Sequence, residues 1–389
     1  MKNIFLSILA LLASTQLFGT IRTVDNRIDL PTNPGQFTTI QAAITASSPG
    51  DTIMVAGSPI AYGSPFNVNK QLVFLGPGYN PLRAIPLVAN ITSGFTFNSS
   101  NTSGSKVMGF VISGGITLTG GGFHANIQIR RNSISGLYAY DSTSNLLFAE
   151  NIVSGAIQFN GGGVHGHTNC NIVNNIFTGG GPIVNSYGYG IVPLSNPSIT
   201  FAHNLWINGN VSNPLISSNW NNFGNPCLLT TGMRNMNIRD NIFYNTNGGT
   251  VGYNPADQNC LLTPVNYNYN NNLTFAGGPL PLLPTPGTIG GGNLNNVNPL
   301  FTSILNSGNP VDFNLDNFRL LANSPAKFAA TDSTDIGPTG GAYPIYLSTN
   351  PVLTGEPPIP AMRFLNHTGT NSVIPGGNLQ IQVKAKKIN

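Results

Sequence analysis

Short pairs of apolar residues at alternate positions recur along the chain, and each pair is followed by an asparagine. One copy runs from Asn126 to Gly136 and places Ile127 and Ile129 ahead of Asn132. The equivalent asparagines, which are 19, 24, 29, 37 and 31 residues apart, are Asn132, Asn151, Asn175, Asn204, Asn241 and Asn272. Apolar residues two positions apart face one side of a strand. The pattern therefore predicts a short strand before each asparagine.

Each of these asparagines is expected to bend the chain, because Asn is the non-glycine residue that most readily adopts the left-handed conformation. Another apolar pair then begins the next side of the coil. A unit this small cannot bury its apolar face alone, so the copies must stack. Short strands without a helical period between copies predict an all-β fold, a parallel β-helix whose coils carry loops of variable length.

One helix is expected near the start of the chain, within residues 38–46. Thr38 and Gln41 fit a capping box at its beginning. Its apolar face would be formed by Ile40, Ala43 and Ile44. The open end of a solenoid must be closed by an element that is polar outside and apolar inside. We therefore expect this helix to cap the first coil.

The sequence divides into three parts. Residues 1–19 begin with Lys2 and an apolar run from Ile4 to Ala13, which is typical of a secretory signal peptide. Residues 20–350 hold the β-helix. Residues 351–389 form a short tail, in which residues 356–360 read as a proline-rich linker and residues 378–384 as one alternating strand. No stretch after the leader is apolar enough to span a membrane, so a secreted or surface-attached, monomeric protein is expected.

Composition supports an ordered, weakly charged molecule. The 40% of hydrophobic residues sit at strand period, so 46 glycines and 29 prolines do not indicate disorder. Only 7% of residues are charged, and the basic ones are scattered, which argues against nucleic-acid binding. Of the three cysteines, Cys170 occupies an inward strand position and is expected in the core. Cys227 and Cys260 either pair between loops or stay free.

With these pieces in place, the chain resembles the secreted right-handed parallel β-helix proteins of the pectin-lyase-like superfamily. The likeness lies in residues 37–44 with 49–53, in the asparagine repeats, and in Asn323-Ser324-Pro325-Ala326 with Asp335-Ile336-Gly337. The last group is similar to the closing segment of many bacterial members. The resemblance implies a right-handed β-helix with an N-terminal capping helix. Members include polysaccharide lyases, hydrolases and adhesins, so the fold leaves the activity open.

Family enzymes bind extended polysaccharides, and their calcium-dependent lyases use clustered carboxylates with an Arg or Lys base. This chain has 12 acidic residues, none adjacent in sequence, and it lacks the Asn-Thr-Asp, Asp-Asp and Gly-His-Gly signatures of related hydrolases. Calcium stays a candidate cofactor, with Asp312/Asp316 and Asp332/Asp335 as carboxylate pairs that turns and caps would equally explain. No metal-ligand residues are assigned.

The stacking of coils brings candidate residues together. At the position before the repeated asparagine, His203 and Asp240 would be neighbours and could form a polarised base, or else part of a solvated polar ladder. Arg131 would lie beside Glu150, most simply as a surface ion pair. Arg130 and Arg239 share the position before that and could contact a polyanion or simply face solvent.

Two further sets complete the hypothesis. His165 and His167 follow a Gly-rich stretch and could contact substrate or a metal, although two histidines alone are a weak metal signal. Tyr187 and Tyr189 lie in an Asn- and Gly-rich loop and could stack on sugar rings. The candidate catalytic residues are thus His165, His167, His203 and Asp240. The candidate substrate-binding residues are Arg130, Arg131, Arg239, Tyr187 and Tyr189.

The sequence therefore predicts an exported protein that binds, and in one version cleaves, an extracellular polysaccharide by lyase or hydrolase chemistry. The alternative is a non-catalytic cell-surface, adhesion or structural protein, for which a stack of polar, carboxylate-poor coils is sufficient. A cluster of carboxylates with an Arg in one groove would favour the enzyme.

Overall fold

The computed structural model describes most of the repeat region and parts of the remainder. The described residues are 19–27, 35–63, 65–80, 87–159, 166–178, 199–207, 236–244, 267–275, 288–304, 316–345, 361–367 and 381–386. The leader, His165, Tyr187, Tyr189, Cys227, Cys260 and Asp312 lie outside these residues, so the predictions made for them are not tested.

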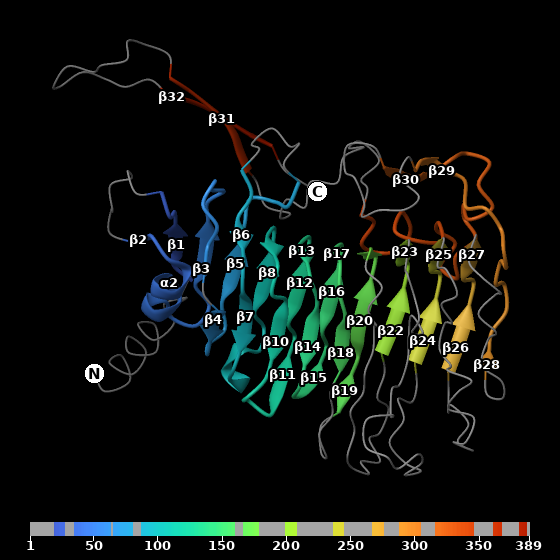
Figure 1. The fold of residues 1–389 in the computed structure, drawn as a ribbon, viewed down its shortest axis with the longest axis horizontal. Helices are drawn as coiled ribbons and strands as arrows, with labels where there is room; N and C mark the ends of the chain where they lie inside the picture. The colour runs from blue at the N-terminus through green and yellow to red at the C-terminus, as the bar shows by residue number, and fades with distance from the viewer. Residues whose placement is uncertain are drawn as a thin grey trace, which may run out of the picture.

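The largest sheet has twelve strands, which lie side by side along the length of the stack (Figure 1). Its pairings from β1 to β28 are all parallel, and the register places Ile129 opposite both Val107 and Phe148. In sheet order the strands are β2 Gln36–Phe37, β1 Ile21–Val24, β3 Thr52–Val55, β5 Val73–Leu75, β8 Lys106–Met108, β12 Gln128–Arg130, β16 Leu147–Ala149, β20 Cys170–Val173, β22 Ile199–Ala202, β24 Met236–Arg239, β26 Tyr267–Asn270 and β28 Thr288–Ile289.

Three further parallel sheets form the other sides of the coils. The eight-stranded sheet holds β27 Leu273–Phe275, β25 Ile242–Tyr244, β23 Leu205–Ile207, β21 Ile176–Phe177, β17 Ile152–Val153, β13 Ser133–Ile134, β9 Val111–Ile112 and β6 Asn90–Ile91. The five-stranded sheet holds β18 Ile157–Phe159, β14 Leu137–Ala139, β10 Ile116–Leu118, β7 Gly94–Phe97 and β4 Pro65–Val68. The three-stranded sheet holds β11 Phe123–Ala125, β15 Ser142–Ser144 and β19 His167–Thr168. The chain is therefore a right-handed parallel β-helix, as predicted.

The core is a set of columns of equivalent side chains inside the coils. The inward column of the largest sheet includes Phe74, Ile129, Phe148 and Phe201, all fully buried. A second column stacks Trp206 between Phe177 and Phe243, with ring centroids 4.7 Å apart on each side. Cys170 is buried as expected, and burial raises the pKa of its thiol to about 12. The predicted period-two pattern therefore marks the core.

The repeated asparagines form a buried ladder beside this core. The side-chain oxygen of Asn204 accepts from the backbone N–H of Asn175 at 2.9 Å and from the Asn175 amide at 3.0 Å. The Asn204 amide in turn donates to the Ile172 carbonyl at 2.8 Å. The same contacts join Asn132, Asn151, Asn175, Asn204, Asn241 and Asn272, and the ladder ends on Asn293.

One detail of the predicted bend is wrong. The left-handed conformation belongs to the residue before each ladder asparagine, not to the asparagine itself. These residues, with φ between 51° and 59°, are Arg131, Glu150, Asn174, His203, Asp240 and Asn271. The ladder asparagine is needed instead for its amide, which satisfies backbone groups on the neighbouring coils.

The predicted helix is α2, Ile40–Ala46, and it lies at the N-terminal end of the stack (Figure 1). Its residues Ile40, Ala43 and Ile44 are buried, as expected. The capping box is wrong, because Thr39 rather than Thr38 is the N-cap and accepts from the Ala42 N–H. Gln41 instead accepts from the backbone N–H of Asn67 at 2.9 Å. The side chain thus joins the helix to β4.

After the last coils the chain turns back along the outside of the stack. We call residues 316–345 the covering segment; it contains β30, Asn317–Leu320, which pairs antiparallel with β29, Phe301–Ser303. Its Phe318, Ala326 and Ile336 pack on Ile176, Leu205, Ile242 and Leu273 of the eight-stranded sheet. An antiparallel hairpin of β31, Ala361–His367, and β32, Ile381–Lys386, follows. Among the described residues no helix is long and apolar enough to cross a membrane.

Candidate functional site

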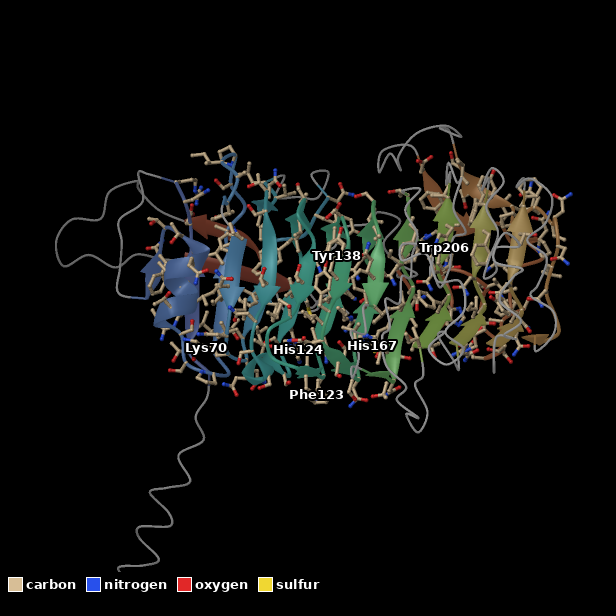
Figure 2. All side chains as sticks on the ribbon, turned by 60° about the horizontal axis from the view of Figure 1, so that its bottom comes forward. Lys70, Phe123, His124, Tyr138, His167 and Trp206 are labelled. Atoms are coloured by element: carbon tan, nitrogen blue, oxygen red, sulfur yellow. The ribbon has the colours of Figure 1, made fainter. Side chains whose placement is uncertain are left out.

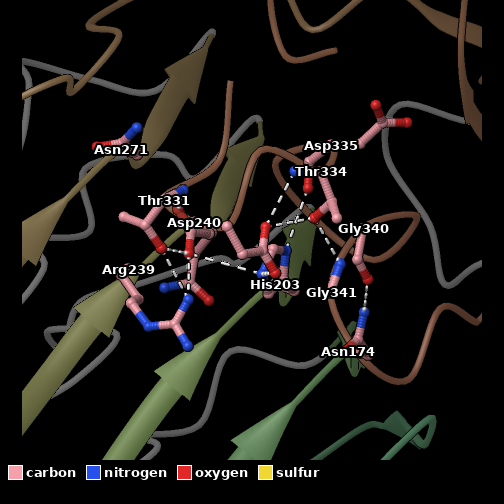
Figure 3. Close-up of polar contacts among 12 residues, drawn as sticks. Asn174, His203, Arg239, Asp240, Asn271, Thr331, Thr334, Asp335, Gly340 and Gly341 are labelled. Carbon is pink, nitrogen blue, oxygen red and sulfur yellow. Dashed lines mark hydrogen bonds and ion pairs between the residues drawn. The ribbon is translucent and has the colours of Figure 1, made fainter. Parts of the chain in front are cut away.

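The covering segment lies directly over the column of left-handed residues that contains the predicted His203–Asp240 pair (Figure 3). Successive contacts run from late coils to early ones. Asn271 donates to the Ala329 carbonyl at 2.7 Å, and Asn174 donates to the Gly340 carbonyl at 2.7 Å. The Gly337 N–H donates to the Asp240 carbonyl at 2.8 Å. The column is therefore a docking strip for this segment, and not the solvated polar ladder that the sequence allowed.

Asp240 is the centre of these contacts and is fully buried. Its carboxylate accepts from the Thr331 N–H at 2.7 Å and from the Thr331 hydroxyl at 2.6 Å. It also accepts from Arg239, whose guanidinium donates to the Thr331 hydroxyl oxygen at 2.9 Å. Both carboxylate oxygens are thus committed to the covering segment and to Arg239. Arg239, predicted to contact substrate, takes part in this same closed network.

His203 is buried beside Asp240, with a side chain only 4% exposed. Its Nδ1 lies 3.1 Å from the Asp335 carbonyl oxygen, and because a carbonyl only accepts, Nδ1 carries the proton. Its Nε2 lies 3.6 Å from Asp240 and 3.4 Å from Asp332. Burial lowers the pKa of His203 below its usual value, although both carboxylates act in the opposite direction.

Asp332 of the covering segment faces His203, with its carboxylate 3.4 Å from Nε2. Burial alone would raise the pKa of Asp332, but hydrogen bonds from Thr334 lower it below its usual value. His203 and Asp240 are adjacent, as the coil stacking predicts, yet the covering segment closes the space around them. A substrate does not reach this base in the described conformation. In this conformation the pair serves to bind the covering segment to the coils.

Arg130, Arg131 and Glu150 form the next group along the same strip. Glu150 is 3% exposed and pairs with both arginines; the Arg131 contact is 2.8 Å. The guanidinium of Arg130 also lies over the ring of Tyr343, 4.7 Å from its centroid. The predicted surface ion pair of Arg131 and Glu150 is therefore part of a three-residue group in which the glutamate is buried and the two arginines are partly buried. Tyr343 covers the small outward residues Ala149, Val173 and Ala202.

His167 lies on β19, on the other side of the coil. Its ring is 8% exposed and meets the edge of Phe159, with centroids 5.0 Å apart. The register places it beside Thr143 of β15. His167 belongs to the three-stranded sheet, whereas His203 follows β22 of the twelve-stranded sheet. The structure therefore does not bring these two predicted catalytic residues into one site. His165, its proposed partner, lies outside the described residues.

A second histidine cluster was not predicted from the sequence. His124 is fully buried; its Nδ1 lies 3.0 Å from the Thr102 hydroxyl and its Nε2 lies 3.3 Å from Asp141. Burial lowers the pKa of His124, and Asp141 opposes this effect. Thr102 is itself fully buried and donates to the Ser99 carbonyl at 2.6 Å, so it is not an accessible nucleophile. The separation of 17 residues between His124 and Asp141, close to one coil, was the available signal.

Asp332 and Asp335, one of the two predicted calcium pairs, bond to groups of the protein itself. Asp332 accepts from the N–H and hydroxyl of Thr334, which is a turn role. Asp335 accepts from Lys327 and the Phe328 N–H. Within the described ranges, no group of three or more His, Cys, Asp or Glu side chains is arranged to hold a metal ion.

The outer face of the five-stranded sheet carries polar and aromatic side chains that are accessible for binding. Its outward column contains only uncharged residues, which are Asn67, Thr96, Thr117, Tyr138 and Gln158. Tyr140, two positions beyond Tyr138, is 44% exposed, and Phe123 at the start of β11 is 48% exposed. Tyr138 and Phe123 are labelled in Figure 2. This face combines hydroxyl, amide and aromatic groups, and the His124–Asp141 pair lies next to its aromatic edge in the chain.

Comparisons with protein-family models and with curated proteins found no match for this chain. The fold and the geometry of its surfaces are therefore the basis for a functional proposal.

Proposed function

We propose that this protein is exported and binds an extracellular polysaccharide on the outer face of its five-stranded sheet. The observation that carries the proposal is the uncharged column from Asn67 to Gln158, flanked by the exposed aromatics Tyr140 and Phe123. The apolar run after Lys2 supports export, and the resemblance to pectin-lyase-like proteins supports a polysaccharide as the partner.

The chemistry of the face suits a neutral glycan better than a uronate polymer. Tyrosine presents an aromatic surface for stacking together with a hydroxyl, and the Thr, Asn and Gln side chains both donate and accept hydrogen bonds. Tyr138 is the outward residue of β14, and Tyr140 follows the last residue of this strand directly and is also exposed. Equivalent residues on neighbouring coils repeat about every 4.8 Å. An extended chain of sugar rings therefore meets repeated, uncharged contacts.

Binding without cleavage is the version that the geometry favours. Cleavage by His203 and Asp240 would require the covering segment to leave them, because Asp240 is fully buried and bonded to Thr331. Glycosidases and lyases need an acid or base that reaches the scissile bond. A surface-binding or adhesion role needs only the open face.

A panel experiment tests the proposal and separates the two versions. Purified protein would be applied to immobilised neutral and uronate polysaccharides, with and without calcium, and the soluble forms would be analysed for new chain ends. We expect retention on at least one neutral glycan and no new chain ends. Absence of retention on every glycan would contradict the proposal, and new chain ends would establish an enzyme instead.

A further inference from the structure

The net positive charge of the chain is concentrated in its tail. The whole sequence has 16 basic and 12 acidic residues, of which the tail, residues 351–389, holds four basic residues and one acidic residue. Lys2 lies in the leader. Removing Lys2 and the tail leaves 11 basic and 11 acidic residues in residues 20–350, so the β-helix region is formally neutral. The tail alone has a formal charge of +3.

Three of the four basic tail residues fall on one hairpin. β31 and β32 pair antiparallel, with Phe364 opposite Lys384 and Ala361 opposite Lys386. The register shifts between Met362 and Phe364, which is where Arg363 stands. All three basic residues are therefore at the same end of the hairpin, where β31 begins and β32 ends. Lys387 follows directly in the sequence.

The strand pattern places two of these basic residues on one face of the hairpin. Lys384 and Lys386 are two positions apart on β32, so the backbone assigns them to the same face, about 6.6 Å apart. The hairpin forms a two-stranded sheet of its own and lies outside the stack of coils (Figure 1). A two-stranded ribbon is marginally stable alone, so a bound partner would also stabilise it.

We propose that the β31–β32 hairpin binds an anionic polysaccharide and so attaches the protein to an acidic extracellular polymer. Three basic residues at one end of the hairpin, two of them on one strand face, fit a polymer with charges repeated along its chain, and the neutral β-helix adds no net repulsion or competing attraction. A lipid bilayer is the other anionic partner and is treated as an outcome of the test. This inference does not depend on the neutral-glycan face.

The test uses the full chain and a binding assay on immobilised polygalacturonate over a series of salt concentrations. The variants are Lys384→Gln, the double variant Lys384→Gln/Lys386→Gln, and Lys106→Gln as the control. Lys106→Gln also removes one charge, but from β8 of the β-helix. A neutral glycan and vesicles of phosphatidylglycerol with phosphatidylcholine are assayed in parallel.

We expect retention of the unmodified chain on polygalacturonate at low salt and its loss at high salt. Each tail substitution should weaken binding by roughly fivefold, as for single charges near a polyanionic surface. Lys106→Gln should change it by less than about twofold, and neutral-glycan binding should not respond to the tail variants. Equal effects of Lys106→Gln and Lys384→Gln, lack of retention, or retention on vesicles but not on polygalacturonate would overturn the proposal.

Discussion

The asparagine ladder shows how single residues hold the coils in register. Each ladder side chain accepts one backbone N–H and donates to a carbonyl of a neighbouring coil, as Asn204 does with Asn175 and Ile172. A buried backbone group without a partner costs about 1–3 kcal/mol. The ladder therefore stabilises the stacking of each coil on the next.

Asn204→Ala should destabilise the protein by about 3 kcal/mol, because it leaves the Asn175 N–H and the Ile172 carbonyl without their partners. Asn171→Ala is the matched control, since its amide contacts the Asn169 carbonyl at the exposed surface. Denaturant unfolding followed by circular dichroism would measure both. Equal midpoints for the two variants would show that the ladder does not carry this stability.

At the scale of single residues, the sequence predicts which asparagines are structurally important but not which role they have. Asparagine is suited both to a left-handed bend and to a buried amide ladder, and the sequence pattern does not separate these uses. Arg131 and Glu150 are residue types that seldom adopt the left-handed conformation, so the sequence gives no signal for it at these two positions. His203 and Asp240 are of types enriched there, but each is followed by an asparagine that fits the bend equally well. Asn293 was missed because its surrounding pattern lacks the apolar pairs.

At the scale of elements, the covering segment decides what the predicted catalytic pair does. Its closing motif was recognised in the sequence at residues 323–326 and 335–337, but its path was not. The distance in sequence between Thr331 and Asp240 is 91 residues, and no periodicity links them. The sequence therefore predicts that His203 lies beside Asp240 but carries no signal that both residues are covered.

Gly341→Ala should displace the covering segment. An added Cβ would lie 2.6 Å from His203 Cδ2, and the backbone there has a φ of +70°. Gly122→Ala is the control, because Gly122 has a φ of +69° but nothing within 4 Å of the added Cβ. Hydrogen exchange at Thr331 and Gly337 should accelerate at least about tenfold only in Gly341→Ala. Similar exchange in both variants would contradict the packing of this segment.

The covering segment should also loosen in acid. Burial lowers the pKa of His203 relative to an exposed histidine near 6.5, so the open state binds the proton more tightly. The stability of the closed state is then fully present above about pH 6.5 and falls as the pH drops towards the lowered pKa. Hydrogen exchange of the segment between pH 7 and 4.5, corrected for intrinsic rates, would measure this.

His203→Asn provides the control for the pH effect. Asn occupies the equivalent left-handed position in two other coils, at Asn174 and Asn271, so the backbone accepts it. The variant should lose most of the pH dependence of segment opening. Retention of the full pH dependence in His203→Asn would assign the effect to another group.

At the scale of the whole molecule, the sequence predicts the β-helix well because a repeat is visible many times. Function is harder to predict because it depends on which faces stay open. The coils leave one uncharged aromatic face on the five-stranded sheet, while the covering segment closes the strip that contains most charged candidates. Taken one position at a time, the sequence favours charged residues as candidates for a functional site. The open face of the folded molecule instead carries tyrosine, threonine and amide side chains.

The most direct test of the proposed function is calorimetric titration of the glycan that the panel selects. The unmodified protein, Tyr138→Ala/Tyr140→Ala, and Gln128→Ala on the outer face of β12 would be compared. Two lost stacking contacts of about 0.5–1.5 kcal/mol each predict at least fivefold weaker binding for the double variant. Gln128→Ala should bind normally. Unchanged affinity in the double variant would contradict the assignment of the glycan to this face.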